Sequence, residues 1–250
     1  MASRLDLVRL APTRVADMGC ATGDGVRELQ RRYPRATPLA VDFALPMLSA
    51  VRTRVPWRSR LLGRSPLLLN ADLRALPLAG GSLGLAWSNL VLHWLHDPLP
   101  ALRELHRVLE EGGLLMFSML GPDTLQELRE ACVQTGVAAP LRSFHDMHDL
   151  GDMLVAAGFG DPVMEMEMLT LTYPSPRGLL ADQRRLGVRN AMLGSLPWRV
   201  WRRVFASYGQ RARDAGVPAS FEIIYGHAWK TAPSTTADGR AIVRFAQRGS

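Results

Sequence analysis

The 250-residue sequence is poor in cysteine and almost devoid of lysine, and it has no long hydrophobic run. Its two cysteines, Cys20 and Cys132, belong to no Cys-x-x-Cys pair or Cys/His cluster, so we predict neither a metal site nor a redox motif. No run of about 18 apolar residues is present, and the amino-terminal stretch lacks the apolar core of a secretory signal. We therefore expect a cytoplasmic protein without a membrane span.

Lysine occurs only at Lys230, so arginine supplies almost all of the positive charge. The 30 basic residues exceed the 23 acidic ones, which leaves a formal net charge of +7. Arginines recur within residues 52–64 and 184–213. A positive field favours an anionic partner, whether a carrier protein, a nucleic acid or a membrane surface, but its sign alone does not choose among them.

Short apolar runs alternate with helical patterns along the chain, which predicts a doubly wound α/β fold with a mostly parallel sheet. The length suits a single domain spanning residues 1–250. The clearest helix is 98–109, where Leu102, Leu105 and Leu109 share one face, and residues 110–113 are expected to end it. The first five predicted strands are Thr13–Met18, Pro38–Asp42, Leu67–Ala71, Leu83–Ser88 and Leu114–Met119.

The carboxyl-terminal half is predicted to add helices around two further strands. Asp123 or Thr124 should cap a helix, with Glu127 completing a capping box. The strand at 163–173 alternates methionine and glutamate, which predicts one wet face and one dry face. We interpret residues 175–215 as a helical lid insertion and residues 231–250 as a flexible tail.

The strongest local signal is the segment VADMGCATGDG at residues 15–25. An apolar strand ends at Asp17, and Gly19 and Gly23 allow the backbone to turn closely around a ligand at the start of a helix. The spacing is neither the G-x-G-x-x-G of a dinucleotide fold nor a P-loop, which would need Gly-Lys-Ser/Thr.

Polar side chains stand at the ends of four predicted strands: Asp17, Asp42, Asp72 and Asn89. In an open α/β sheet, ligands bind outside the carboxyl ends of the strands, so these residues can encircle one ligand. Asp42 is placed to accept both hydroxyls of a ribose, and Phe43 beside it can pack on a purine. The alternative for each acid taken singly is that it caps a helix.

The segments DMGCATG, VDFALPML, NADLRALPL and WSNLVLHW resemble the successive motifs of class I S-adenosylmethionine-dependent methyltransferases. The resemblance covers residues 13–120 and implies a Rossmann-like, mostly parallel seven-stranded sheet with S-adenosylmethionine as cofactor. It assigns the glycine turn to the methionine end of the cofactor, the acid after the second strand to the ribose, and the Asp72-Leu73 pair to the adenine. The residues implied to bind the cofactor are Asp17, Gly19, Cys20, Gly23, Asp42, Phe43, Asp72, Leu73, Asn89 and Leu90.

A narrower resemblance covers residues 88–131, residues 148–159 and the final YGHAWK. These segments are similar to the malonyl-acyl carrier protein methyltransferase family of biotin synthesis, which implies methyl transfer to the free malonyl carboxylate of the acyl carrier protein or of malonyl-CoA. They also resemble a methyltransferase-like assembly factor of respiratory complex I that is described as an arginine hydroxylase. Nucleic-acid methylation is not expected, because SNLVLHW stands where amino-directed enzymes carry their Pro-Pro-aromatic signature.

The sequence departs from the family pattern in three places. Ala21 replaces the usual glycine in the middle of the turn, and Gly84 replaces an acid that is common early in the fourth strand. Family members also carry a longer segment before the glycine turn, whose helices cover cofactor and substrate. We expect either that Met1 is not the true start or that the chain binds the cofactor without turning over a substrate.

Methyl transfer to a carboxylate needs no general base, since the carboxylate is already a nucleophile at neutral pH. We therefore predict no catalytic acid or base, only residues that align the reactants and exclude water. Candidates for orienting the substrate are Arg177, Arg184 and Arg185 in the predicted lid, with Trp94 as a wall of the pocket. A basic lid would also attract an acidic acyl carrier protein.

Overall fold

The computed structural model describes residues 1–57, 61, 63–185, 192–194, 196–212 and 216–232. One seven-stranded sheet organises the chain, with strand order β3-β2-β1-β4-β5-β7-β6. Strands β1 to β5 pair in parallel, while β7 runs antiparallel to both β5 and β6. The strands are β1 (Arg14–Met18), β2 (Thr37–Asp42), β3 (Leu67–Asn70), β4 (Leu83–Asn89), β5 (Leu109–Leu120), β6 (Gly160–Tyr173) and β7 (Val217–Trp229). This topology confirms the predicted fold class.

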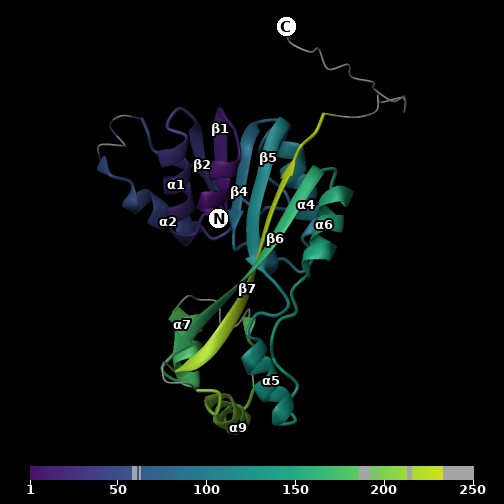
Figure 1. Ribbon diagram of the computed structural model, residues 1–250. Helices are drawn as coiled ribbons and strands as arrows, with labels where there is room; N and C mark the ends of the chain where they lie inside the picture. The colour runs from purple at the N-terminus through teal and green to yellow at the C-terminus, as the bar shows by residue number, and fades with distance from the viewer. Residues whose placement is uncertain (58–60, 62, 186–191, 195, 213–215, 233–250) are drawn as a thin grey trace.

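Helices flank the sheet and alternate with its strands (Figure 1). The α-helices are α1 (Asp24–Arg32), α2 (Leu45–Arg54), α4 (Leu99–Val108), α5 (Gln126–Gln134), α6 (Met147–Ala156), α7 (Pro176–Arg185) and α9 (Trp198–Gly209). Two 3-10 helices, η1 (Ala2–Leu7) and η2 (Leu92–Trp94), complete the described elements.

The central strands are buried on both faces, which explains why they read as continuous apolar runs. In β4, every residue from Leu83 to Ser88 is buried and only Asn89, at the carboxyl end, is exposed. A core of aliphatic side chains from β1, β2, β4 and β5 packs against α4 and α6. The apolar interior therefore stops where the polar strand ends begin, which places those polar residues at one edge of the sheet.

Two lobes are joined by a long ribbon of β6 and β7 (Figure 1). We call the sheet with α1, α2, α4 and α6 the sheet lobe. The other end of the ribbon, with α5, α7 and α9, is the helical lobe. The helical lobe has a core of its own, in which Leu128 and Cys132 of α5 meet Trp201 and Tyr208 of α9. Helices α7 and α9 both come from the stretch between β6 and β7.

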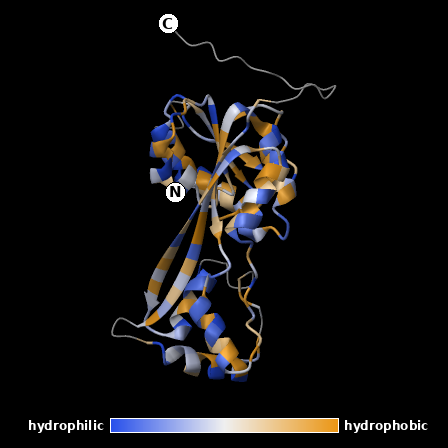
Figure 2. Cartoon of the chain, turned by 45° about the vertical axis from the view of Figure 1, so that its right-hand side comes forward, coloured by the Kyte–Doolittle hydropathy of each residue, from blue (hydrophilic) through white to orange (hydrophobic). Residues whose placement is uncertain are grey.

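The ribbon carries mixed hydrophobic and hydrophilic residues along its length (Figure 2). The expected dry face of β6 is wrong beyond its first residues: Met164 is half-buried, whereas Met166 and Met168 are exposed. β6 is the edge strand, and most of its length past the sheet lobe is exposed on both faces, so alternation of residue type does not produce alternation of burial there.

Two local predictions are also corrected. The capping box at α5 does not form: α5 begins at Gln126 after Leu125, whose φ of 57° is left-handed, and no side chain caps it. Glu127 instead accepts hydrogen bonds from the backbone N–H and hydroxyl of Ser220 on β7, at 3.0 and 2.5 Å. The segment 110–113 lies within β5, because the strand begins directly after α4.

Among the described residues, no helix is long and apolar enough to span a bilayer, and no cluster of His, Cys, Asp and Glu is arranged to hold a metal ion. The tail prediction for residues 231–250 falls almost entirely on residues 233–250, which lie outside the described part of the chain.

Candidate cofactor site

The glycine turn after β1 is held against β2 by its backbone. The N–H groups of Gly19 and Cys20 both donate to the carbonyl oxygen of Val41, at 2.8 and 2.9 Å. Gly19 has a φ of 78°. A Cβ placed on Gly19 would stand 2.5 Å from a methyl carbon of Val91, in the loop after β4. Only glycine fits here, because a side chain would push the two loops apart.

Asp42, at the carboxyl end of β2, ties the turn to the start of α2. Its Oδ2 accepts the N–H of Ala21 at 2.9 Å, and its Oδ1 accepts the N–H of Ala44 at 2.8 Å. Each carboxylate oxygen has two lone pairs, so one on each oxygen remains for a further donor. The backbone therefore fixes the orientation of a carboxylate that still has capacity for a pair of hydroxyl groups.

Asp17 lies beneath the turn, with 2% of its surface exposed. Desolvation raises its pKa to about 7, against the opposing effect of a hydrogen bond from the Val26 backbone. Its Oδ2 is buried without a hydrogen-bond partner among the described residues, and it would stand 2.5 Å from a Cβ on Gly25. An unpartnered buried carboxylate oxygen is costly in its charged form, which is why the pKa of Asp17 is raised.

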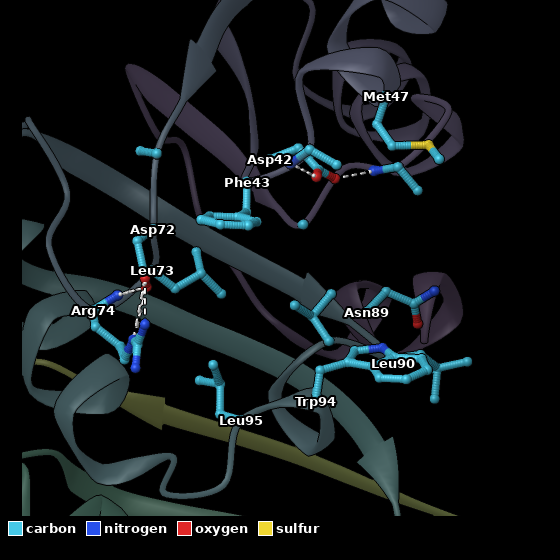
Figure 3. A pocket seen from close by; sticks show the side chains of 15 residues that line it. Asp42, Phe43, Met47, Asp72, Leu73, Arg74, Asn89, Leu90, Trp94 and Leu95 are labelled. Atoms are coloured by element: carbon cyan, nitrogen blue, oxygen red, sulfur yellow. Dashed lines mark hydrogen bonds and ion pairs between the residues drawn. The ribbon is translucent and has the colours of Figure 1, made fainter. Parts of the chain in front are cut away.

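A cavity of about 570 Å³ opens at this edge of the sheet (Figure 3). Eight of the residues singled out from the sequence line it: Gly19, Asp42, Phe43, Asp72, Leu73, Asn89, Leu90 and Trp94. They come from the ends of β1, β2 and β4 and from the loop after β3. The cavity volume is in the range of small-molecule and cofactor sites.

One wall of the cavity is suited to a flat apolar ring. Phe43 is 77% exposed and its ring stands in the cavity, with Leu73 facing it (Figure 3). Asp72 pairs with Arg74, whose Nη2 lies 2.6 Å from Oδ2, and this contact lowers the pKa of the Asp72 carboxyl group. The wall therefore combines apolar surface with a fixed acceptor.

The opposite wall is formed by the end of β4. The Asn89 Oδ1 accepts the hydroxyl hydrogen of Ser118 at 2.7 Å, and the Leu90 N–H donates to the Ser118 carbonyl oxygen at 2.9 Å. Leu90 has a φ of 56°, which is rare for a residue with a side chain. Backbone held in this region is typical of ligand sites, where neighbouring bonds stabilise the strained conformation.

The remaining residues of the predicted set do not line this cavity. Asp17 is buried below it, Cys20 packs among Val26, Leu48 and Val51, and Gly23 precedes α1. The predicted substrate-orienting residues Arg177, Arg184 and Arg185 are exposed on α7 in the helical lobe, and Arg177 stacks over the Trp198 ring. The structure thus separates the cofactor set from these arginines.

Two of the three departures from the family pattern, at Ala21 and Gly84, have a local explanation. Ala21 adopts a φ of 43°, so it takes the left-handed turn that a glycine would take without strain. At Gly84, a Cβ would stand 2.8 Å from Pro12 and 2.9 Å from the Glu110 carboxylate. Pro12 and Glu110 already occupy the space that a longer acid would need.

Some residues of the cavity were not predicted from the sequence. Ala44 and Met47 follow Phe43 within VDFALPML, and Leu95 follows Trp94, so extending each motif by one helical turn would have included them. Arg74 also lines the cavity, but its role in holding Asp72 depends on a side-chain conformation that spacing alone does not define.

These features fit S-adenosylmethionine. The nucleoside matches the apolar wall at Phe43 and the free acceptor capacity of Asp42, while the glycine turn allows close approach of the methionine end. Asp17 lies beneath the turn and does not line the cavity, so its ionised form would act on a cationic ligand group through charge alone.

Comparisons with known proteins agree with this assignment. A family described as "Methyltransferase domain" matches residues 16–117. The YcgJ protein of Bacillus subtilis has the same fold, with a TM-score of 0.64 and 15% identity over 92% of this chain and 97% of that one. Phosphoethanolamine N-methyltransferase 2 of Haemonchus contortus, solved with S-adenosyl-L-methionine, matches with a TM-score of 0.55 and 17% identity over 90% of this chain and 50% of that one.

The fold and the site together define an S-adenosylmethionine-dependent methyltransferase. A malonyl-[acyl-carrier protein] O-methyltransferase of Gallionella capsiferriformans is 45% identical over 249 residues, covering 98% of this chain and 86% of that protein. The chain belongs to the malonyl-[acyl-carrier protein] O-methyltransferase family.

Proposed function

We propose that this protein methylates the free carboxylate of a malonyl group carried by the acyl carrier protein, as its relatives are named for doing. The observation that carries the proposal is the similarity along nearly the whole chain, 45% identity over 98% of its length. In biotin synthesis, the resulting ester would hide the charge of the carboxylate and let the acyl chain pass as an ordinary primer.

The chemistry is a direct displacement. S-adenosylmethionine supplies an electrophilic methyl group when bound. A malonyl carboxylate oxygen would take this methyl group, and the electron pair of the broken carbon–sulfur bond would remain on sulfur. No proton moves, so the protein needs no general base. Its tasks are alignment of oxygen, carbon and sulfur, and exclusion of water.

The residues of the cavity serve these tasks in different ways. Asp42 and the glycine turn hold the cofactor, while Leu90, Trp94 and Leu95 supply apolar surface on the side where the acceptor must approach. An apolar wall strips water from the carboxylate and makes it a better nucleophile.

The helical lobe is the proposed contact for the carrier protein. Arg184, Arg185, Arg199 and Arg202 are exposed on α7 and α9, and no carboxylate in the described part of the chain forms an ion pair with them. An acidic carrier would be steered toward such a surface. Both cysteines are free and buried, which suits a reducing cytoplasm.

The proposal is tested by incubating the full chain with malonyl-acyl carrier protein and methyl-labelled S-adenosylmethionine. We expect label on the malonyl-carrier and a mass gain of one methyl ester, and no label on acetyl-carrier, which lacks the carboxylate. Binding of the cofactor with no transfer to any malonyl thioester would contradict the proposal.

A further inference from the structure

A second cavity of about 600 Å³ adjoins the cofactor cavity, and no part of the cofactor is assigned to it above. The two cavities share Trp94 and Leu95 as lining residues. The second cavity is otherwise lined by His93, His96, Met119, Arg142, Ser143, Phe144 and His145. A group bound there would meet the cofactor cavity across one shared wall.

Arg142 is the only permanently charged residue among those lining the second cavity, and none of the described lining residues is an acid. Its Nη2 donates to the carbonyl oxygens of Trp94 and Leu95, each at 3.1 Å. Its Nε and Nη1 donors have no partner among the described residues. Among the described residues Asp146 forms no ion pair with Arg142, and its Oδ1 accepts the N–H groups of His148 and Asp149 at the start of α6.

The backbone holds Arg142 at the junction of the two lobes. Its N–H donates to the carbonyl oxygen of Met192 at 3.0 Å, and Leu141 pairs with Leu193 in an isolated bridge. The side chain then reaches back to the loop after β4. The backbone of Arg142 is thus anchored to the helical lobe and its guanidinium to the sheet lobe before any ligand binds, which reduces the entropy lost on binding.

His93 gives the second cavity a further polar group. It is 4% exposed, and its Nδ1 is buried without a hydrogen-bond partner among the described residues. Desolvation and then the Arg142 charge lower the pKa of His93 to about 4, so the imidazole is neutral near pH 7. Its ring packs against Trp94 and Phe144, with ring centroids 5.0 and 5.7 Å apart.

The geometry points to the second cavity as the binding site of the acyl acceptor, with Arg142 as the residue that binds its free carboxylate beside Trp94. A guanidinium with unpaired donors matches a carboxylate, and lysine would reproduce the charge but not the planar fork. A neutral imidazole at His93 adds a hydrogen bond to the acyl group without adding a second charge. This inference rests on the proposed function, since it identifies the substrate group that the same site must recognise.

The inference predicts discrimination between acyl groups. Because hydrogen bonds to a charged group are stronger than those between neutral groups, wild-type protein should bind malonyl-pantetheine at least ~10-fold more tightly than acetyl-pantetheine in the presence of S-adenosylhomocysteine. In Arg142→Gln, which keeps a donor for the Trp94 or Leu95 carbonyl, that preference should fall to about twofold or less. Binding of acetyl-pantetheine and of S-adenosylmethionine should stay within about twofold of wild type.

Arg142→Lys should recover part of the preference, and the matched control Arg103→Gln, at an exposed position on α4, should keep all of it. Retention of the malonyl preference in Arg142→Gln would overturn the inference. Equal weakening of malonyl, acetyl and cofactor binding would overturn it as well, because that pattern marks a purely structural role. The proposed function is judged separately, by whether the wild-type protein methylates malonyl-carrier at all.

Discussion

The sheet lobe and the helical lobe expose side chains of opposite charge to their surroundings. The cofactor cavity in the sheet lobe is bordered by Asp42 and Asp72, with Asp17 buried beneath, whereas α7 and α9 of the helical lobe expose arginines. The cavity with Arg142 lies between them. On the proposed function, the cationic cofactor binds in the sheet lobe and the helical lobe attracts the acidic carrier, so we expect the reacting groups to meet where the lobes join.

The largest effect on cofactor binding is expected from a substitution in the glycine turn of the sheet lobe. Gly19→Leu should abolish cofactor binding, weakening it by about 100-fold or more, because the side chain would overlap Val91 and the φ of 78° is strained for leucine. Calorimetric titration with S-adenosylhomocysteine measures the loss. Gly151→Ala is the control, since no atom lies within 4 Å of a Cβ there and α6 should tolerate or welcome alanine. Unchanged binding by the folded leucine variant would contradict the site.

The next effect concerns the ribose acceptor. Asp42→Asn leaves one oxygen for the N–H groups of Ala21 and Ala44 and turns an NH₂ group toward the other, so the loop must shift. We expect about 10- to 100-fold weaker cofactor binding and a loss of about 1–2 kcal/mol in stability. Denaturant titration measures the loss of stability, and a fluorescence binding assay measures the loss of affinity. A variant with normal affinity would show that the nucleoside does not reach this carboxylate.

We expect the Asp17 carboxylate to lower the stability of the folded protein and to strengthen the binding of S-adenosylmethionine. Its folded-state pKa is raised from 3.8 to about 7, so between these pH values the folded protein holds a proton that the unfolded chain has released. The contribution of Asp17 to stability is therefore greatest at low pH and falls as the pH rises toward 7.

Asp17→Asn removes this pH dependence. We expect the free energy of unfolding of the variant to exceed that of wild type by about 1–2 kcal/mol at pH 8, with the difference shrinking toward pH 4. We also expect the variant to bind S-adenosylmethionine about 10-fold more weakly at pH 8. Urea unfolding across the pH range measures the first effect. A variant that is less stable at pH 8 would refute the buried-carboxylate account.

The smallest effect is expected at the surface of the helical lobe. Arg199→Glu combined with Arg202→Glu should lower kcat/KM for malonyl-acyl carrier protein about three- to tenfold at low salt, with little change at high salt. A short malonyl thioester without the carrier should react at an unchanged rate. Equal loss on both substrates would show that these residues do not recognise the carrier.

Much of the sheet lobe could be predicted from the sequence because its signals are local. Buried strands read as apolar runs, and the parallel arrangement brings Asp42, Asp72 and Asn89 to one edge. Other features depend on contacts between distant segments. Glu127 resembles part of a capping box, yet Ser220 binds it, and Arg142 is positioned by Met192 and Trp94. Contacts between residues that are far apart in the sequence cannot be inferred from residue spacing.

The position of the bound nucleoside decides whether this edge of the sheet is the cofactor site. The most direct measurement is a crystal structure of the protein with S-adenosylhomocysteine. It should place the base against Phe43 and the ribose hydroxyls within hydrogen-bonding distance of Asp42. A nucleoside bound elsewhere, or no binding at millimolar concentration, would contradict it.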